Sequence, residues 1–431
     1  MPACLNLRHS SVARVMRQLG LLVLTLALQW VTTATGLDDI QNITASLSRM
    51  EAMLASRHQC NTSWMQEYAK QHQALLPARR LVHVPFLSGL ADRIIGMVTT
   101  TAFAIMINRA VQSGRRPPLQ PLEGMFTSPY INWTREYDAE WLLEPLKDKA
   151  NPKNYNATVL AAGEYNAVHT LNDFKLLDKF LRQDIDKIFG SAKNIIFLMN
   201  RGKTIRLFEN TFYSKRLTEM GLAPETAFGC IVQFLLRPRP EIFSSLMPQL
   251  ERITNDEARG ALKIGIHVRA GDSVLLNSNH NIDSSHYQTF FTCAQQIEDW
   301  ALGQNQKVIW YLATDSRKIR EYAVAKYGEK ILTSLSARIE HSSKEANTGC
   351  TVNCTVSHAG FQHAVAEWWM MGACDYHVVT LNSGFGRSAG MRSLRRNNIY
   401  TVREDRRNPM KACDNTTFTD LENLSYDWSG I

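Results

Sequence analysis

The second half of the chain alternates between short apolar runs and stretches of helical spacing. The apolar runs are rich in β-branched and aromatic residues, as buried strands are, and lie at 264–268, 307–313, 330–333, 376–381 and 398–402. The helical stretches between them lie at 285–302, 317–327 and 361–374, and a further helix begins with residues 387–392. Strands that alternate with helices predict a parallel sheet with right-handed crossovers. The predicted fold class is therefore α/β.

The first half carries a sparser version of the same pattern. Residues 81–86 predict a strand, 94–110 an apolar helix, and 194–199 a further strand. An Arg-Pro-Arg-Pro stretch at 237–240 interrupts a helical pattern and indicates the crossing between two domains. The predicted boundaries are a leader at 1–36, a stem at 37–80, domains at 81–255 and 256–410, and a tail at 411–431.

The first 36 residues have the pattern of a targeting segment. Arg8, Arg14 and Arg17 precede an apolar run at 19–31, and small residues follow. The run is short for a bilayer span, which takes about 20 apolar residues. A cleaved signal peptide and an uncleaved signal-anchor both stay open, and either one makes the rest lumenal. An anchor predicts a single-pass type II Golgi membrane protein, whereas cleavage predicts an ER or secreted one.

Residues 37–80 are polar and helix-prone, and we expect them to separate the membrane from the catalytic body. Ile40, Ile43, Leu47, Met50 and Leu54 recur at steps of three and four, which is a seam of two heptads. Sustained coiled coils need more heptads than this. A lone stem helix and a dimer through the stem are both compatible with the seam.

Sequons and cysteines agree with the secretory pathway. Asn-X-Ser/Thr triplets without Pro begin at Asn42, Asn61, Asn132, Asn156, Asn353, Asn415 and Asn423. The cysteines after the leader are Cys60, Cys230, Cys293, Cys350, Cys354, Cys374 and Cys413. Their number is odd, so one thiol is free or bridges two chains, and the sequence leaves the pairing open. The spacing of Cys and His does not favour a zinc site.

The chain is basic, with 48 Lys and Arg against 40 Asp and Glu, a formal net charge of +8. Such an excess is compatible with nucleic acid, an anionic membrane surface or an anionic small ligand. The basic residues are dispersed and form no stripe interleaved with aromatic residues. We therefore exclude nucleic acid as a partner.

Polar residues follow three predicted strands of the second half. Arg269 follows the strand at 264–268, Asp315 follows 307–313, and a Ser/Gly turn at 383–386 follows 376–381. In a parallel sheet these positions share the carboxyl edge, where ligands bind. An Arg and a helix N-terminus suit a diphosphate, and a carboxylate suits the paired N–H groups of guanine. The expected ligand is a nucleoside diphosphate, which in a secretory enzyme indicates a nucleotide sugar.

One Asp-X-Asp sequence, Asp184-Ile185-Asp186, matches the carboxylate pair of metal-dependent enzymes that use such donors. It lies within a helical pattern, and residues two apart on a helix do not face each other. We interpret it as a solvated helix face and predict no metal. An arginine can stabilise a departing diphosphate in place of a metal ion.

Four sequence motifs resemble those of the fucosyltransferase superfamily, over about residues 80–405. His-Val-Arg-Ala-Gly-Asp at 267–272 resembles the H-x-R-x-G/T-D motif, and Tyr-Leu-Ala-Thr-Asp-Ser at 311–316 resembles the second motif. Residues 364–390 resemble the third motif, most closely in its plant version. The stretch from 87 to 109 resembles the glycine loop G-L-G-N-R, with Ala91 and Asp92 in place of its second Gly and Asn.

This resemblance implies a GT-B fold and inverting, metal-independent transfer of fucose from GDP-fucose to a glycan or glycoprotein hydroxyl. It implies that Arg269 binds the β-phosphate and assists departure of GDP, and that His267 lines the nucleotide pocket. Asp315 would meet guanine, and Asp272 is the candidate general base. The donor-binding residues carried over are His267, Arg269, Gly271, Asp315, Ser316, Ser383, Gly384, Phe385, Gly386, Gly89 and Arg93.

Simpler roles and two other functions stay open at this point. His267 would merely cap its strand, and Asp315 would cap the following helix. Trp368 and Trp369 are expected in the core. A lumenal sulfotransferase shares the leader and the α/β pattern, but would need a Lys- or Arg-led phosphate loop after the first strand. An inactive glycan-binding relative would share everything except turnover. The acceptor is not identified by any motif.

Overall fold

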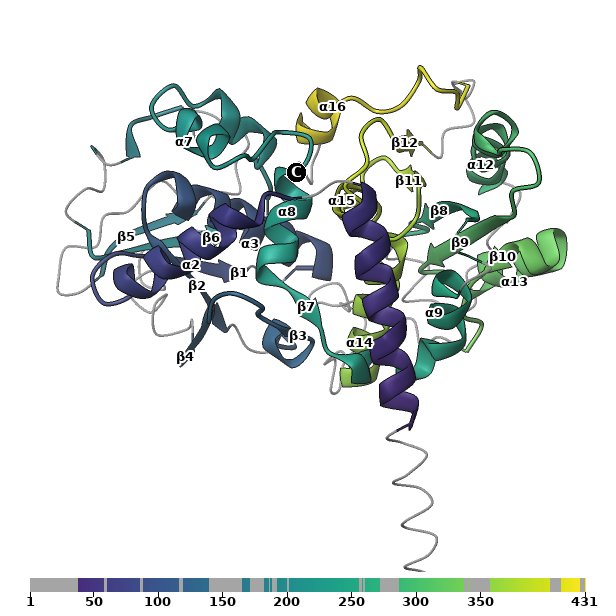
Figure 1. Cartoon of the computed structure of the whole chain (residues 1–431), viewed down its shortest axis with the longest axis horizontal. Helices are drawn as coiled ribbons and strands as arrows, with labels where there is room; N and C mark the ends of the chain where they lie inside the picture. Colours follow the sequence, from purple (N-terminus) through teal and green to yellow (C-terminus); the bar gives the residue numbers. More distant parts are fainter. Residues whose placement is uncertain are drawn as a thin grey trace, which may run out of the picture.

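The computed structural model describes most of the chain beyond the leader (Figure 1). It describes residues 38–57, 60–85, 88–115, 119–138, 165–170, 182–185, 187, 192–199, 201–255, 258, 260–271, 287–336, 340, 357–403, 412–426 and 431. The predicted leader lies outside these residues. So do Asp186, Asp272, Cys350, Cys354, Asn156 and Asn353. Within the described part, no helix combines the length and apolarity that a membrane span requires.

The first half forms a five-stranded parallel sheet in the order β4-β2-β1-β6-β5. Its strands are β1 (Arg80–Pro85), β2 (Ala110–Arg115), β4 (Thr134–Asp138), β5 (Tyr165–Thr170) and β6 (Asn194–Met199). The strands predicted at 81–86 and 194–199 are confirmed. Helices α3 (Leu90–Met106) and α2 (Thr62–Leu75) pack against β1 and β2. Nearly all of α3 is buried, because its apolar residues go all the way round the helix.

The second half forms another five-stranded parallel sheet, in the order β10-β9-β8-β11-β12. Its strands are β8 (Leu262–Val268), β9 (Val308–Thr314), β10 (Ile331–Leu332), β11 (Tyr376–Thr380) and β12 (Ile399–Val402). Its helices are α12 (Gln288–Ala301), α13 (Arg317–Tyr327), α14 (His358–Met371) and α15 (Gly384–Arg392). All five predicted strands of this half are confirmed, and the α/β class with them. The strand order reverses at β8, so the carboxyl ends of β8 and β11 flank a topological switch point.

The two sheets are joined where the proline-rich stretch predicted a crossing. Helix α8 (Ala227–Leu235) ends before β7 (Arg237–Pro238), which pairs with β3 (Phe126–Thr127). A 3-10 helix, η3 (Pro240–Leu246), and α9 (Met247–Thr254) then lead to β8. The other short elements are η1 (Leu122–Gly124), η2 (Ile205–Glu209), α7 (Ser214–Glu219) and η5 (Gly328–Lys330). One continuous apolar core draws on both halves and contains Trp368 and Trp369, as expected.

The segment predicted as a free stem belongs to the folded body. Residues 38–57 form a helix, the long purple helix in front in Figure 1, and Ile43, Leu47, Met50 and Leu54 on it are buried. At the end of this helix, Arg57 donates to the carbonyls of Ala373 and Cys374 at 2.6 and 2.8 Å. The apolar seam is therefore covered by this chain itself. The basis for a dimer through the seam is removed.

Disulfides tie both ends of the described chain to the sheets. Cys60 pairs with Cys230 of α8, and Cys293 of α12 pairs with Cys413. Cys374 is a free, buried thiol. Cys350 and Cys354 fall outside the described residues.

The predicted tail also folds back onto the first half. Helix α16 (Leu421–Tyr426) contacts η2, and Lys203 Nζ donates to the carbonyl of Ser425 at 3.1 Å. The last segment thus crosses from the second sheet to the first. It helps to hold the two halves together.

Candidate functional site

The loop after β8 is held by a carboxylate from the neighbouring strand. Arg269 Nη1 lies 2.5 Å from Asp315 Oδ2. The backbone N–H groups of Ala270 and Gly271 also donate to Asp315, at 2.6 and 3.2 Å. Both Asp315 oxygens are thus engaged by the loop, and the carboxylate braces Arg269. That Asp315 also meets guanine stays a prediction. Burial raises the pKa of Asp315, against the opposing charge of Arg269 and the two N–H donors.

Asp315 does not cap the following helix, so that alternative is wrong. Ser316 is the N-cap residue of α13, and its hydroxyl accepts from the backbone N–H of Ile319 at 3.4 Å. Ser316 is buried and occupied by this role. Among the predicted donor-binding residues, it therefore has a structural function already.

The same loop is fastened to β11. The backbone N–H of Arg269 donates to Thr380 Oγ1 at 2.9 Å, and this hydroxyl donates to the carbonyl of His267 at 3.3 Å. Gly271 has a φ of +103°, a conformation that favours glycine. The guanidinium of Arg269 is thereby fixed at the switch point with its side chain 29% exposed. Asp272, the predicted base, lies just outside the described residues.

His267 is buried at the end of β8, with its ring stacked on Phe385 at a centroid distance of 5.1 Å. Its Nδ1 has no hydrogen-bond partner among the described residues. Burial, reinforced by the charge of Arg269, lowers the pKa of His267 to about 3. The imidazole is therefore neutral at physiological pH. It can offer hydrogen bonds and a flat face to a ligand.

Helix α15 begins earlier than its pattern predicts. Ser383 is its N-cap residue, and Gly384, Phe385 and Gly386 form its first turn rather than a preceding loop. Ser383 makes no side-chain cap hydrogen bond. First-turn N–H groups have no partner within a helix and favour anions. This turn lies at the carboxyl end of β11, next to the Arg269 loop.

The first sheet contributes the N-terminus of α3, which begins at Leu90 rather than at 94. Gly89 is its N-cap residue. Arg93 is buried, with Nη2 bonded to the carbonyl of Gln120 at 2.7 Å and its guanidinium 5.1 Å from the ring centre of Phe361. Burial lowers the pKa of Arg93 to about 10. No described contact links Arg93 with Arg269.

Two arginines at this edge, Arg201 and Arg387, were not predicted as site residues from the sequence. Arg201 follows β6, and Arg387 lies on α15 just after the glycine turn; both are buried. Together with Arg269 they act electrostatically on Asp92, in the first turn of α3. Each could have been noticed: Arg201 stands just beyond a strand end, and Arg387 within Gly-Phe-Gly-Arg. Helix α3, which follows β1, packs against α15, which follows β11, so the two halves of the chain are in contact here.

Asp184, the first residue of the Asp-X-Asp sequence, is engaged by neighbouring groups. Asp184 Oδ1 accepts from the backbone N–H of Lys187 at 3.1 Å and from the Tyr213 hydroxyl at 2.5 Å. Asp186 lies outside the described residues. Across the described ranges there is no group of three or more His, Cys, Asp or Glu side chains placed to hold a metal ion.

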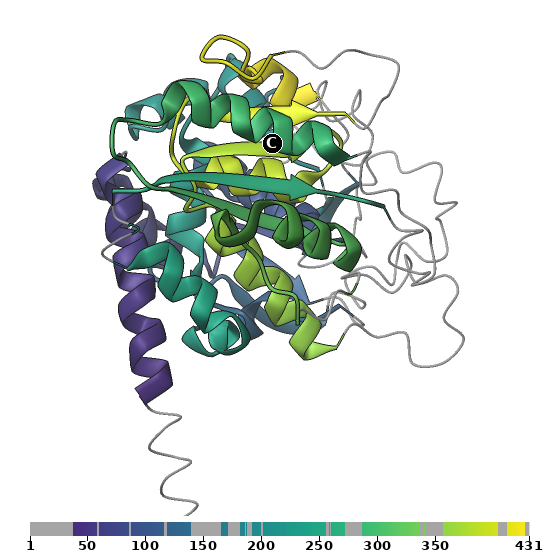
Figure 2. The same ribbon diagram turned by 90° about the vertical axis from the view of Figure 1, so that its right-hand side faces the viewer.

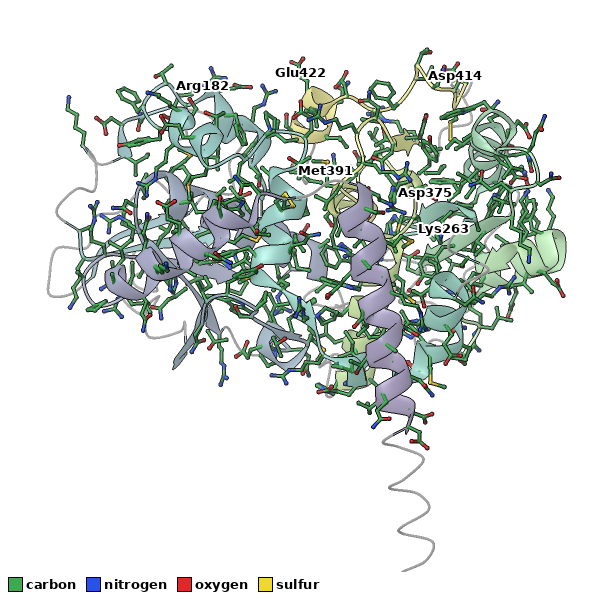
Figure 3. All side chains as sticks on the ribbon, viewed as in Figure 1. Arg182, Lys263, Asp375, Met391, Asp414 and Glu422 are labelled. Carbon is green, nitrogen blue, oxygen red and sulfur yellow. A yellow bond between two sulfur atoms is a disulfide. The ribbon has the colours of Figure 1, made fainter. Side chains whose placement is uncertain are left out.

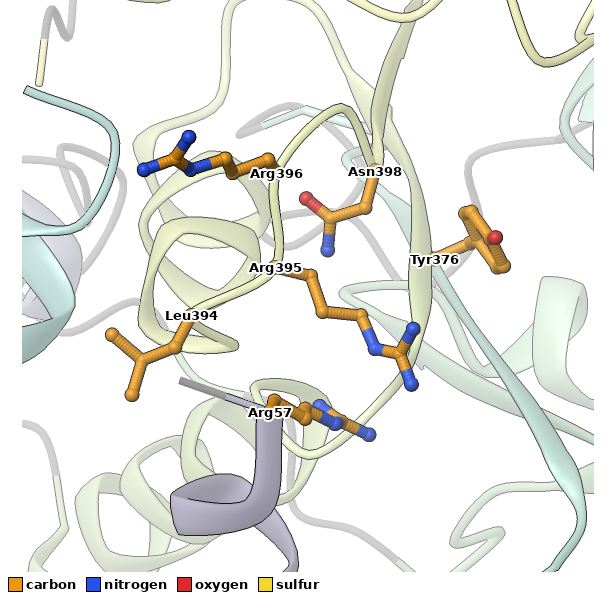
Figure 4. Close-up of a pocket in the computed structure, with 6 residues that line it drawn as sticks. All are labelled: Arg57, Tyr376, Leu394, Arg395, Arg396 and Asn398. Atoms are coloured by element: carbon orange, nitrogen blue, oxygen red, sulfur yellow. The ribbon is translucent and has the colours of Figure 1, made fainter. Parts of the chain in front are cut away.

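A cavity of about 210 Å³ lies at the edge of the second sheet opposite to the Arg269 edge. Figure 4 shows its lining, which includes Arg57, Arg395, Arg396 and Tyr376. Arg57 and Arg395 both pair with Asp375, at 2.7 and 2.9 Å. Figure 3 labels Asp375 beside Lys263, whose backbone N–H donates to Asp375 at 2.8 Å. In Figure 2 the arrows of this sheet point away from the helix at 38–57 and so away from this cavity. The cavity is separate from the Arg269 edge.

No family model matches the chain, and no curated protein matches it. Among solved structures, a mutant of Arabidopsis thaliana FUT1 in complex with GDP aligns with a TM-score of 0.52 and 16% identity, covering 81% of this chain and 77% of that chain. The fold is that of a solved fucosyltransferase. The resemblance read from the four motifs is confirmed at the level of the fold. The fucosyltransferase NodZ from Bradyrhizobium aligns with a TM-score of 0.43 and 16% identity, covering 72% of this chain and 92% of that one.

Proposed function

We propose that this protein is a GT-B fucosyltransferase that transfers fucose from GDP-fucose to a hydroxyl group of a glycan or glycoprotein. The observation that carries the proposal is the position of Arg269, which Asp315 holds at the carboxyl edge of the second sheet. Arg201 and Arg387 lie near enough to act, with Arg269, on the same carboxylate, Asp92. The N-terminal turn of α15 adds backbone N–H donors at the same place. A fold shared with a solved fucosyltransferase supports the assignment of this edge to a nucleoside diphosphate sugar.

The main chemical task of the site is to stabilise the departing diphosphate. Arginine offers planar, paired donors that match phosphate oxygens, and Asp315 holds the Arg269 fork in place. Charge that develops on the β-phosphate as the bond to fucose breaks is then met by fixed cations in a partly dry site. The acceptor oxygen attacks the anomeric carbon from the opposite face, and the configuration inverts. In this mechanism the arginines carry the role that a metal ion has elsewhere.

A lumenal location completes the proposal. The apolar run at 19–31 would deliver the chain to the secretory pathway, as a Golgi signal-anchor or a cleaved peptide. The sequon residues Asn42, Asn61, Asn132, Asn415 and Asn423 are all exposed, so glycans can be attached there. The alternative of a sulfotransferase lacks support, because residues 86–89, Phe-Leu-Ser-Gly, carry no Lys or Arg.

The test is donor turnover by the full chain, expressed in a secretory host and solubilised. Free nucleotide is followed over a panel of GDP- and UDP-sugars, with EDTA present. We expect GDP release from GDP-fucose alone, and its loss in Arg269→Ala. Release only without EDTA would contradict the metal independence and redirect attention to Asp184 and Asp186. GDP binding without turnover over a broad acceptor panel would indicate an inactive binding relative, and no GDP binding would overturn the proposed function.

A further inference from the structure

Helix α3 has one residue that is not buried. All its other residues, from Leu90 to Met106, are buried between the first sheet and the second half of the chain, and the exception is Asp92. Asp92 is partly exposed and lies in the first turn, three residues after the N-cap residue Gly89. Solvent, and hence a ligand, can therefore reach the helix at this carboxylate.

The charges around Asp92 come from three different elements. Arg201 follows β6, Arg269 follows β8 and Arg387 lies on α15, and each acts on the Asp92 carboxylate. On its own helix the neighbouring Arg93 is engaged elsewhere, by Gln120 and Phe361. Asp92 is thus a partly exposed carboxylate within electrostatic range of the arginines proposed to hold the diphosphate. It belongs to the first half of the chain, whereas Arg269 and Arg387 belong to the second.

This carboxylate stands where the resembled glycine loop has Asn. An amide cannot take up a proton from an alcohol, whereas a carboxylate can. Asp92 could also serve only as a structural counter-ion that balances the charge of the three arginines. A carboxylate with that role alone would not need to be open to solvent. The partial exposure of Asp92 on an otherwise buried helix is what favours a chemical role.

We propose that Asp92 is the general base of the transfer, an inference that rests on the proposed fucosyltransferase activity. The acceptor oxygen forms a bond to the anomeric carbon of fucose while the bond from that carbon to the β-phosphate oxygen breaks. GDP leaves with the electron pair of the broken bond. The acceptor proton passes to the Asp92 carboxylate and from there to solvent. The proton acceptor then comes from the first half of the chain, and the leaving-group cations Arg269 and Arg387 come from the second half.

The ionisation of Asp92 agrees with this role. Burial raises the pKa of Asp92 to about 6, and the charges of Arg201, Arg269 and Arg387 oppose this rise. At neutral pH the carboxylate is ionised, and it is more basic than an ordinary aspartate. A base is most effective when its pKa lies near the working pH.

The decisive experiment compares Asp92→Asn with the full-length wild-type protein at saturating acceptor. Asn restores the residue of the resembled loop and keeps the size of the side chain. We expect kcat to fall by about 10²–10⁴-fold, the range of general base catalysis. GDP should bind at least as tightly, because a negative charge beside the arginines is removed. The acid limb of the wild-type kcat/KM profile near pH 6 should disappear. In Asp92→Ala, added formate should restore part of the rate.

Further variants distinguish general base catalysis by Asp92 from other roles of this residue. Asp299→Asn, which alters an exposed carboxylate on α12, should keep wild-type kinetics. If Asp92→Asn kept the wild-type kcat and bound GDP more tightly, the proposal would be overturned. Asp92 would then be a residue whose charge weakens donor binding. A joint loss of GDP binding and thermal stability, without formate rescue, would make it a counter-ion. Loss of the acid limb in Asp272→Asn instead would assign the base to Asp272. Absence of GDP-fucose turnover in the wild type would overturn the proposed function itself.

Discussion

The Nδ1 atom of His267 lies 2.9 Å from the position that a Cβ atom would take at Gly386. A Cβ there would also come within 2.8 Å of Val379 Cβ. Residue 386 must therefore be glycine for the first turn of α15 to pack on the ends of β8 and β11. This close approach joins two of the resembled motifs, which lie over 100 residues apart in the chain.

Gly386→Ala should displace either the His267 ring or the start of α15. Overpacking of this kind costs about 1–3 kcal/mol of unfolding free energy. We expect a lower Tm together with weaker GDP binding, because the displaced groups line the proposed donor site. Thermal denaturation and GDP titration measure the two effects. Gly260→Ala is the control, since a Cβ at Gly260 meets nothing within 4 Å; equal behaviour of the two variants would contradict the packing argument.

Asp315→Ala should release the loop that carries Arg269. The substitution leaves the N–H groups of Ala270 and Gly271 without their acceptor, at a cost of about 1–3 kcal/mol for each group that stays buried. We expect a large fall in kcat for donor turnover, with GDP affinity also reduced. Asp315→Asn, which keeps one carbonyl oxygen, should lose less. If Asp315 met guanine instead, these variants would lose the preference for GDP over UDP while keeping loop stability.

The strands of the second half could be predicted because their signals are local. The run at 264–268 is apolar and β-branched, and β8 contains it. Helix α13 was predicted with its observed bounds, since Ser316 caps it and Gly328, with a φ of +58°, ends it. The starts of α3 and α15 were placed too late. Gly89 has no side chain with which to cap α3, whereas Ser383 is a residue type typical of N-caps that makes no cap bond here.

The charge cluster and the docking of the N-terminal helix depend on distant parts of the chain. Arg57 contacts Asp375 at a separation of 318 positions in the chain. From the sequence alone, the apolar seam of the helix at 38–57 is therefore equally compatible with a dimer interface and with packing on the same chain. Asp92 and Arg387 approach only because α3 packs against α15. The proximity of Asp92 and Arg387 cannot be predicted from a single sequence. The Arg269 position, in contrast, was predicted because parallel strands share one functional edge.

A buried ion pair behind β9 predicts an acid-sensitive fold. Arg320 makes two bonds with Glu367, at 2.6 and 3.0 Å, and donates to the carbonyl of Thr314 at 2.6 Å. Burial opposes the ionisation of Glu367, but Arg320 and His363 outweigh it and lower the pKa of Glu367 to about 2. A lowered pKa stabilises the fold above the ordinary value of 4.5, and this stability is lost as the pH falls toward 2.

Glu367→Gln should remove that part of the pH dependence. At neutral pH the variant should lose about 3–5 kcal/mol of unfolding free energy, because Arg320 is left as an uncompensated buried charge. Chemical denaturation at several pH values between 2 and 7 measures both effects. Asp299→Asn, on the surface of α12, should follow the wild-type curve throughout. A Glu367→Gln curve parallel to that of the wild type would show that this pair does not govern acid stability.

The N-terminal helix should act on stability and not on oligomeric state. Met50 is fully buried on the face that contacts the body, and Met50→Ala should cost about 2–5 kcal/mol of unfolding free energy. Ser48→Ala, at an exposed position of the same helix and outside any sequon, is the matched control. Sedimentation should give wild-type and both variants the same mass. A wild-type dimer that Met50→Ala converts to a monomer of unchanged stability would show that the seam binds a second copy, against the packing observed within one chain.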